Sequence, residues 1–214
     1  MRLGRFNEHN LSPHLPCAPH RTAKIRRMPN DNYPITLLCH PATPAPVVRA
    51  VEAQASFLAD GSLAIAYRLW GDIARLLIPQ PQPSAPKDFL WEHTCFEAFI
   101  GVRGDAAYRE FNFSPSGQWA AYAFFDYRKR DEAFVCKTAP IISSKQFAGR
   151  FELEAIIAPG VLPHGSGPLE IGLAAVVESS DTVDGRHSYW ALKHPAERPD
   201  FHHRDAFSLI LNQP

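Results

Sequence analysis

The chain has 214 residues, 45% of them hydrophobic, and its 22 basic residues are balanced by 22 acidic ones. This composition suits one globular domain with a hydrophobic core, and a neutral chain has no general electrostatic attraction to phosphate backbones or anionic membranes. No apolar run approaches the roughly 20 residues needed to cross a bilayer, so neither nucleic-acid nor membrane partners are expected.

The first 33 residues carry basic residues, prolines and histidines, without hydrophobic periodicity and without the apolar stretch of a signal peptide. We expect residues 1–33 to be a disordered tail and residues 34–214 to form a single domain. The four cysteines include no CxxC pair, which argues against a zinc ribbon or a thioredoxin-like site. Free thiols without a secretory signal predict a cytoplasmic protein.

From Ile35 onward, short apolar runs alternate with a period of two, which is typical of strands, and helical periodicity is hard to find. Asp60-Gly61, between two alternating runs, predicts a hairpin. A proline-rich segment at 79–86 predicts a loop, because proline cannot donate to a sheet. In chain order, the predicted strands are 35–40, the two arms of 48–71, 93–102, 108–115, 118–128, 137–147, 150–159, 168–179, 188–192 and 206–212.

About ten short strands, with turn signals at regular spacing and little helix, predict an all-β, antiparallel β-sandwich. Twenty prolines also disfavour an architecture of long helices. No internal repeat and no second domain is visible in the sequence.

Two segments carry a family resemblance: LWEHTCFEAFIG with YREFNFSPSGQWAAYAFFDYR, and YWALKHPAERPDFHHRDAFSLIL nearer the C-terminus. Their order, an acidic strand followed by a tyrosine-led strand and a glycine turn, resembles the DOMON-like domains, close to carbohydrate-binding module family nine. The resemblance covers about Ile35 to Leu211 and implies an immunoglobulin-like sandwich that holds a sugar or haem. In sugar-binding relatives two tryptophans stack on the sugar, which implies such roles for Trp91 and Trp190, with Glu97 as a polar contact.

The residues themselves point to the same region. A sugar presents apolar ring faces and a rim of hydroxyls, so its site needs flat aromatics and short polar groups. Strand alternation sends Glu110 and Asn112 to the face opposite Phe111 and Phe113. A half-buried Glu97 needs partners, which Arg109 or Arg128 would supply. The predicted ligand contacts are Trp91, Glu97, Asn112, Arg128 and Trp190, with Glu110 and His194 as weaker candidates.

The leading hypothesis is therefore a non-catalytic module that binds a small ligand, most plausibly a saccharide. One alternative is a haem-binding electron-transfer module. In haem-binding DOMON relatives methionine and histidine are the axial ligands, but the only methionines here are Met1 and Met28, so a bis-histidine site would be required. A lesser alternative is an enzyme that acts on sugars through Glu97 and Glu110.

The fourth hypothesis is a scaffold protein that binds no small ligand. Neither a metal nor any other cofactor is expected. The histidines at 194, 202 and 203 lack the spacing of a zinc protease, and the acidic segment 179–187 does not match an EF-hand calcium loop. No oligomeric state is predicted.

Overall fold

The structure, a computed structural model, describes residues 33–180 and 186–214. The predicted tail, apart from Tyr33, and the centre of the acidic segment 179–187 lie outside the described residues. Within the described part of the chain, no helix has the length and apolar character required to cross a membrane.

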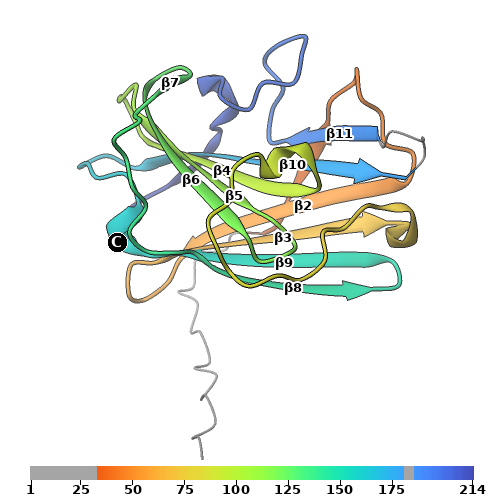
Figure 1. Ribbon diagram of the computed structural model, residues 1–214. Helices are drawn as coiled ribbons and strands as arrows, with labels where there is room; N and C mark the ends of the chain where they lie inside the picture. The colour runs from red at the N-terminus through yellow and green to blue at the C-terminus, as the bar shows by residue number, and fades with distance from the viewer. Residues whose placement is uncertain (1–32, 181–185) are drawn as a thin grey trace, which may run out of the picture.

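Two antiparallel layers face each other (Figure 1). The first sheet has the order β1-β2-β3-β9-β8, and the second has the order β1-β11-β10-β4-β5-β6-β7, with β12 also paired to β10. The first sheet consists of β1 (Ile35–Cys39), β2 (Val48–Phe57), β3 (Leu63–Gly71), β9 (Arg150–Ile157) and β8 (Ile141–Phe147). The second adds β11 (Arg186–Ala191), β10 (Leu169–Ser179), β4 (Cys95–Val102), β5 (Tyr108–Phe113), β6 (Trp119–Asp126), β7 (Lys129–Arg130) and β12 (Leu209–Leu211).

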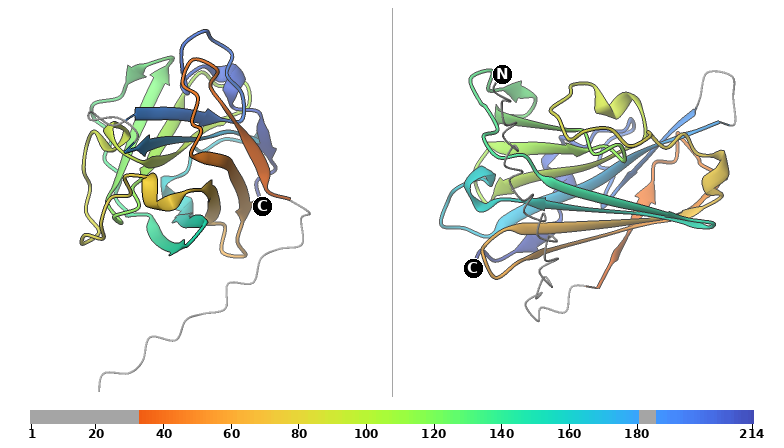
Figure 2. Two further views of the ribbon diagram at one scale, coloured as in Figure 1. Left: turned by 90° about the vertical axis from the view of Figure 1, so that its right-hand side faces the viewer. Right: turned by 60° about the horizontal axis from the view of Figure 1, so that its bottom comes forward.

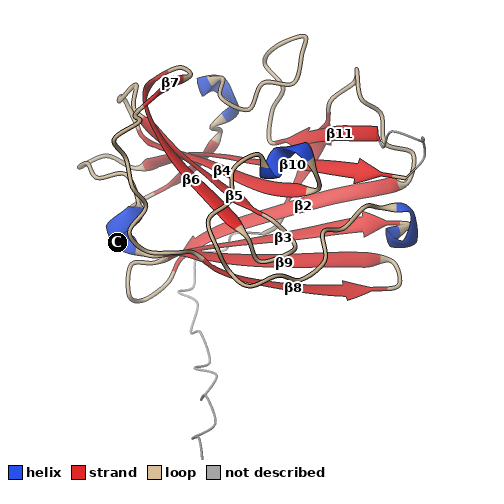
Figure 3. Ribbon diagram, viewed as in Figure 1, coloured by secondary structure: helices blue, strands red, loops and turns tan. Residues whose placement is uncertain are grey.

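Strand β1 belongs to both sheets. Its first half pairs with β2, with Ile35 opposite Ala53, and its end pairs with β11, with Cys39 opposite Trp190. Among the described residues, helix is confined to four short 3-10 turns in the connections, drawn in blue in Figure 3. These turns are η1 (Ile73–Arg75), η2 (Leu90–Glu92), η3 (Pro159–Val161) and η4 (Arg204–Ala206).

The main core fills the space between the sheets, whose two layers are also visible in Figure 2. Phe96 and Phe111 of the second sheet share it with Tyr67 and Phe151 of the first. A second apolar cluster lies on the outer face of the second sheet, where the segment 199–207 packs across β4, β10 and β11. Because both faces of β4 are covered, all eight of its residues are buried.

The predicted β-sandwich is confirmed, with twelve described strands rather than about ten. The two-residue β7, which is too short to leave a periodic signal, is the one described strand that the sequence did not predict. The Asp-Gly hairpin is also confirmed: Gly61 has a φ of 80°, and the Leu58 N–H donates to the Ser62 carbonyl. Glycine adopts that left-handed conformation without steric cost.

Candidate ligand-binding site

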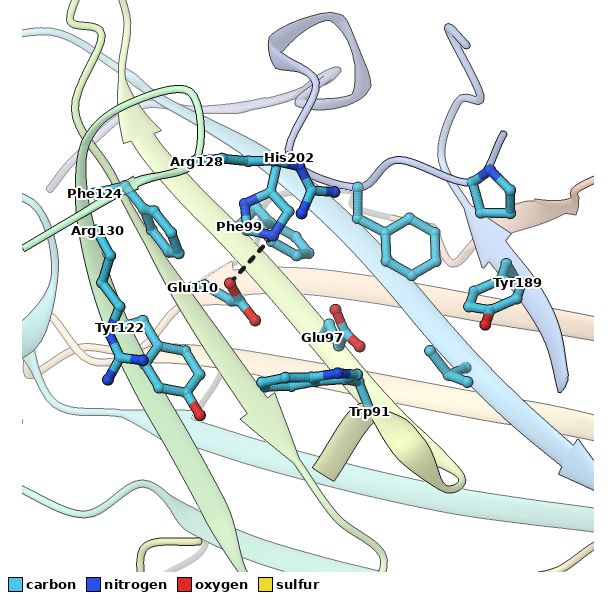
Figure 4. Close-up of a pocket in the computed structure, with 13 residues that line it drawn as sticks. Trp91, Glu97, Phe99, Glu110, Tyr122, Phe124, Arg128, Arg130, Tyr189 and His202 are labelled. Atoms are coloured by element: carbon cyan, nitrogen blue, oxygen red, sulfur yellow. Dashed lines mark ion pairs between the residues drawn. The ribbon is translucent and has the colours of Figure 1, made fainter. Parts of the chain in front are cut away.

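A cavity of about 430 Å³ lies on the outer face of the second sheet. Its floor is formed by β4, β5, β6, β10 and β11, and its walls by η2, the turn before β7 and the loop after β11 (Figure 4). Its aromatic lining consists of Trp91, Phe99, Tyr122, Phe124, Tyr189 and Phe201. Its polar lining consists of Glu97, Glu110, Arg128, Arg130 and His202. An apolar wall with a few convergent polar groups is the usual composition of a small-molecule site.

Trp91 forms one wall of the cavity from the single turn η2. The residue before this turn, Phe89, has a left-handed backbone with a φ of 62°, and its ring meets the Trp91 indole edge-on at 5.4 Å. Trp91 also packs against Tyr122 at 6.1 Å between ring centroids. Trp91 is still 37% exposed, so an aromatic face is held in place and remains accessible.

Glu97 projects from β4 into the cavity, and its carboxyl group has little protein support. The side chain is only 4% exposed, and its Oε1 is buried without a hydrogen-bond partner among the described residues. Burial, with a smaller contribution from the neighbouring Glu110 charge, raises the pKa of Glu97 well above its usual value. Burial therefore favours the protonated form of Glu97, which is able to donate one hydrogen bond.

Glu110 lies diagonally across the strand pair from Glu97, because Glu97 is opposite Asn112 and Glu110 is opposite Phe99. The Asn112 amide donates to Glu110 Oε1 at 2.7 Å. Burial raises the pKa of Glu110 to about 7, although the bond from Asn112 and the positive charge of Arg128 oppose the shift. The two carboxyl groups share one space, between Trp91 and His202 (Figure 4).

His202 lies above the carboxyl groups, with its Nε2 3.6 Å from Glu110 Oε2. Its Nδ1 is 2.8 Å from the hydroxyl of Tyr108, and that hydroxyl oxygen accepts the Arg128 backbone N–H. These contacts engage Nδ1 and leave Nε2 facing the cavity. Burial, and then the charge of Arg128, lowers the pKa of His202 to about 4, so His202 is uncharged at neutral pH.

The two arginines of the cavity already have acidic partners. Arg128 donates to Asp200 Oδ1 at 2.9 Å, and the backbone of Arg128 is left-handed with a φ of 54°. Arg130 lies 3.5 Å from the Glu132 carboxylate and stacks over the Tyr122 ring at 4.3 Å. The cavity therefore has two cations at its wall that are paired elsewhere, and two carboxyl groups on its floor.

Of the predicted contacts, the structure brings Trp91, Glu97 and Arg128, with the weaker candidate Glu110, to one cavity. Trp190 does not line this cavity. It is 6% exposed, lies in the main core and donates from Nε1 to the Ser188 hydroxyl. Alternation on β11 directs Trp190 inward and Tyr189 outward. The expectation that Trp190 faces a ligand alongside Trp91 is therefore corrected.

Two further expectations need correction. Asn112 is fully buried and does not line the cavity, because its amide is engaged by Glu110, so it positions a carboxyl group instead of reaching a ligand. Arg109 points away from Glu97, donates to the Leu162 carbonyl at 2.9 Å and does not line the cavity. Neither arginine considered for Glu97 pairs with it, since Arg128 bonds to Asp200.

The sequence-based reasoning missed Tyr122, Tyr189 and Arg130 as lining residues. Alternation on β6 carries the signal for Tyr122, because Ala120, Tyr122 and Phe124 all belong to the outer cluster. The same rule places Tyr189, once the inward face of β11 is known. Nothing local in the sequence marks Arg130, which reaches the cavity only because β7 pairs back onto β6.

The histidines considered for haem or metal are dispersed. His194 stacks edge-on against His40 at 4.7 Å and bonds through Nε2 to the Leu38 carbonyl, away from the cavity. His203 caps η4 by accepting the Asp205 N–H, and His93 lies 3.0 Å from Glu178. Among residues 33–180 and 186–214, no three His, Cys, Asp or Glu side chains are grouped as metal ligands would be.

No protein-family model and no curated protein matches the chain. A solved structure of a provisionally assigned carbohydrate-binding protein from Bacteroides uniformis ATCC 8492 aligns with a TM-score of 0.56 and 14% identity, over 82% of this chain and 83% of that one. Two structures of a carbohydrate-binding module of family nine from Caldicellulosiruptor kristjanssonii also align. The cellotriose complex gives a TM-score of 0.44 and the glucose complex 0.40, both at 13% identity over 80% of this chain and 80% and 81% of theirs. The Bacteroides likeness establishes a shared β-sandwich fold. Membership of the DOMON-like domains stays a prediction.

Proposed function

We propose that this protein binds a saccharide in the cavity on the outer face of its second sheet, without chemical change to the ligand. One observation carries the proposal. An accessible tryptophan, Trp91, stands beside two hydrogen-bonding carboxyl groups, Glu97 and Glu110, in a cavity of about 430 Å³.

The chemistry of the lining supports this ligand class. The apolar face of a sugar ring packs favourably on the flat indole of Trp91 and the Tyr122 ring. The hydroxyl rim needs groups that donate as well as accept: a protonated Glu97 donates, the oxygens of Glu97 and Glu110 accept, and His202 presents its Nε2. The fold is shared with a protein assigned to carbohydrate binding, which adds support of a general kind.

The test is a calorimetric titration against glucose, xylose, galactose, mannose, cellobiose and xylobiose. We expect at least one of these sugars to bind, and Trp91→Ala to weaken its affinity by about tenfold or more, as for aromatic anchors that become buried on binding. The matched control is Phe125→Ala. It removes another aromatic side chain, which is 64% exposed on β6 and does not line the cavity, and should leave affinity unchanged. Absence of binding by every sugar, or equal loss in both variants, would refute the proposal.

Hydrolysis is a second candidate, because the enzyme hypothesis required Glu97 and Glu110 in one cleft and both line this cavity. A glycosidase needs one ionised and one protonated carboxyl group. The raised pKa of Glu97 and the pKa of about 7 of Glu110 allow such a pair at neutral pH, so hydrolysis is tested directly, and the binding proposal expects no turnover. Incubation with cellobiose and xylobiose, followed by chromatography of the products, tests this: release of monosaccharide that is lost in Glu110→Gln would establish an enzyme.

A further inference from the structure

We propose that the saccharide bound in this cavity is an amino sugar, with its ammonium group held between Glu97 and Glu110. This inference rests on the proposed saccharide function and goes further, because it specifies the chemical class of the sugar and the charge that the site selects.

The floor of the cavity lacks a counter-charge. Glu97 and Glu110 are 4% and 5% exposed, and the only side-chain hydrogen bond described for the pair comes from the uncharged Asn112. Glu97 Oε1 has no hydrogen-bond partner among the described residues. Buried carboxyl groups normally have ionic or hydrogen-bonding partners. An ammonium group offers three donors and one positive charge, which is what these two groups lack.

The neighbouring cations do not fill this gap. Arg128 is bonded to Asp200, and hydrogen bonds from Tyr127 and Arg128 lower the pKa of Asp200 against the opposing effect of its burial, so that pair is ionised. Arg130 lies beside Glu132 and over the Tyr122 ring. Among the described lining residues other than the tyrosines, therefore, the ionisable groups without a charged ion-pair partner are the two carboxyl groups of Glu97 and Glu110, together with the uncharged His202.

The aromatic walls favour the same ligand. A cation within about 6 Å of an aromatic ring centroid is attracted by the ring quadrupole. Trp91, Phe99, Tyr122 and Phe124 surround the two carboxyl groups within one cavity. A protonated amino sugar would meet these rings with its ammonium group while its apolar ring face stacks on Trp91.

Binding of the ammonium group must also account for the protons that Glu97 and Glu110 carry. In the empty cavity burial raises the pKa of Glu97 well above its usual value and that of Glu110 to about 7, so below pH 7 the pair retains protons that free carboxyl groups would have lost. When R–NH₃⁺ enters, the pair releases protons to solvent and the ammonium takes over their role. Affinity for an amino sugar should therefore increase with pH from 5 to 7, and affinity for a neutral sugar should not.

Other titratable groups face this pair, and their charges enter the balance. His202 stays neutral throughout the range because its pKa is about 4, and Tyr67 and Cys95 are buried with pKa values raised well above the ordinary ones. The titratable and charged groups around the two carboxyl groups are Tyr67, Asp88, Cys95, Tyr108, Tyr122, Arg128, Arg130, Tyr189, Asp200 and His202.

The test compares glucosamine with glucose and N-acetylglucosamine by calorimetry at pH 6.5. The amine of glucosamine is protonated there if it titrates roughly like an α-amino group, at about 7.7–8.0. We expect glucosamine to bind at least about tenfold more tightly than either neutral sugar. Titrations in two buffers of different ionisation enthalpy should show net proton release with glucosamine alone. Glu97→Gln should abolish the preference, whereas Phe125→Ala should preserve it.

The outcomes separate the two proposals. Equal affinity for all three sugars would overturn the amino-sugar inference and leave saccharide binding in place. If no sugar binds but cyclohexylammonium does, saccharide binding and the amino-sugar identity are both wrong, although the cavity selects cations. If none of the four ligands binds, the amino-sugar inference fails, and the titration against the six sugars above decides saccharide binding. The buffer comparison uses the wild-type protein, so it decides the question even if Glu97→Gln does not fold.

Discussion

Replacement of Glu97 by glutamine is expected to stabilise the protein at pH 8 and to leave its stability unchanged at pH 4. Burial raises the pKa of Glu97 in the folded state, whereas in the unfolded chain it titrates near 4.3. Between those two values the folded state binds the extra proton, so the stability of the wild type falls as pH rises. Glutamine resembles the protonated acid and cannot ionise, so the penalty disappears.

The expected gain at pH 8 is about 1–3 kcal/mol in the free energy of unfolding, the usual cost of a buried polar group without partners. Urea titrations of both proteins at pH 4, 6 and 8 measure it.

The pH dependence that His202 adds to stability has the opposite sign. Its pKa is lowered to about 4, so it removes stability as pH falls from about 6.5. Because His202 is present in both proteins, its contribution cancels in the difference. Parallel pH profiles for the two proteins would contradict the neutral-acid assignment.

Phe96→Ala is expected to cost about 3–5 kcal/mol in the free energy of unfolding, the range for deleting a buried aromatic ring. Phe96 is fully buried on β4, and its ring lies 5.0 Å from Tyr67 and 6.1 Å from Phe151, both on the opposite sheet. Its removal would leave a hole where the two layers meet, and close packing prevents the neighbours from filling it.

Urea unfolding of Phe96→Ala, with Phe125→Ala as the matched control, tests this expectation. Phe125 is the same residue type in the same sheet but is 64% exposed, so its loss should change stability by less than about 0.5 kcal/mol. Similar costs for the two variants would mean that the inter-sheet core is not the main source of stability.

The same alternation that built the sandwich also placed part of the candidate site. Alternation places Glu110 on the face opposite Phe111, and the same rule places Glu97 opposite Phe96, because side-chain direction in a strand has a period of two. Trp91, a predicted ligand contact, is 37% exposed. Inferences of this kind depend only on a few neighbouring residues.

Trp190 shows where local reasoning fails. The sequence predicts its strand, and it predicts that Tyr189 and Trp190 point to opposite faces of that strand. It does not predict which of the two faces packs into the core. That depends on β1 and on the first sheet, which cover the Trp190 side, and on the loop that carries Phe201, which packs against Tyr189. The same holds for Arg109, whose partner, the Leu162 carbonyl, comes from another segment.

The sequence by itself therefore determined the strands, their turns and the direction of each side chain relative to its neighbours, because these follow from backbone geometry and local hydrophobic pattern. Only the tertiary structure decided that the outer face of the second sheet carries the cavity, and that Glu97 and Glu110 lie there without a countercharge. The physical reason is that burial and pairing are set by contacts between segments far apart in the chain, such as Glu110 with His202 and Arg128 with Asp200, and no local pattern encodes them.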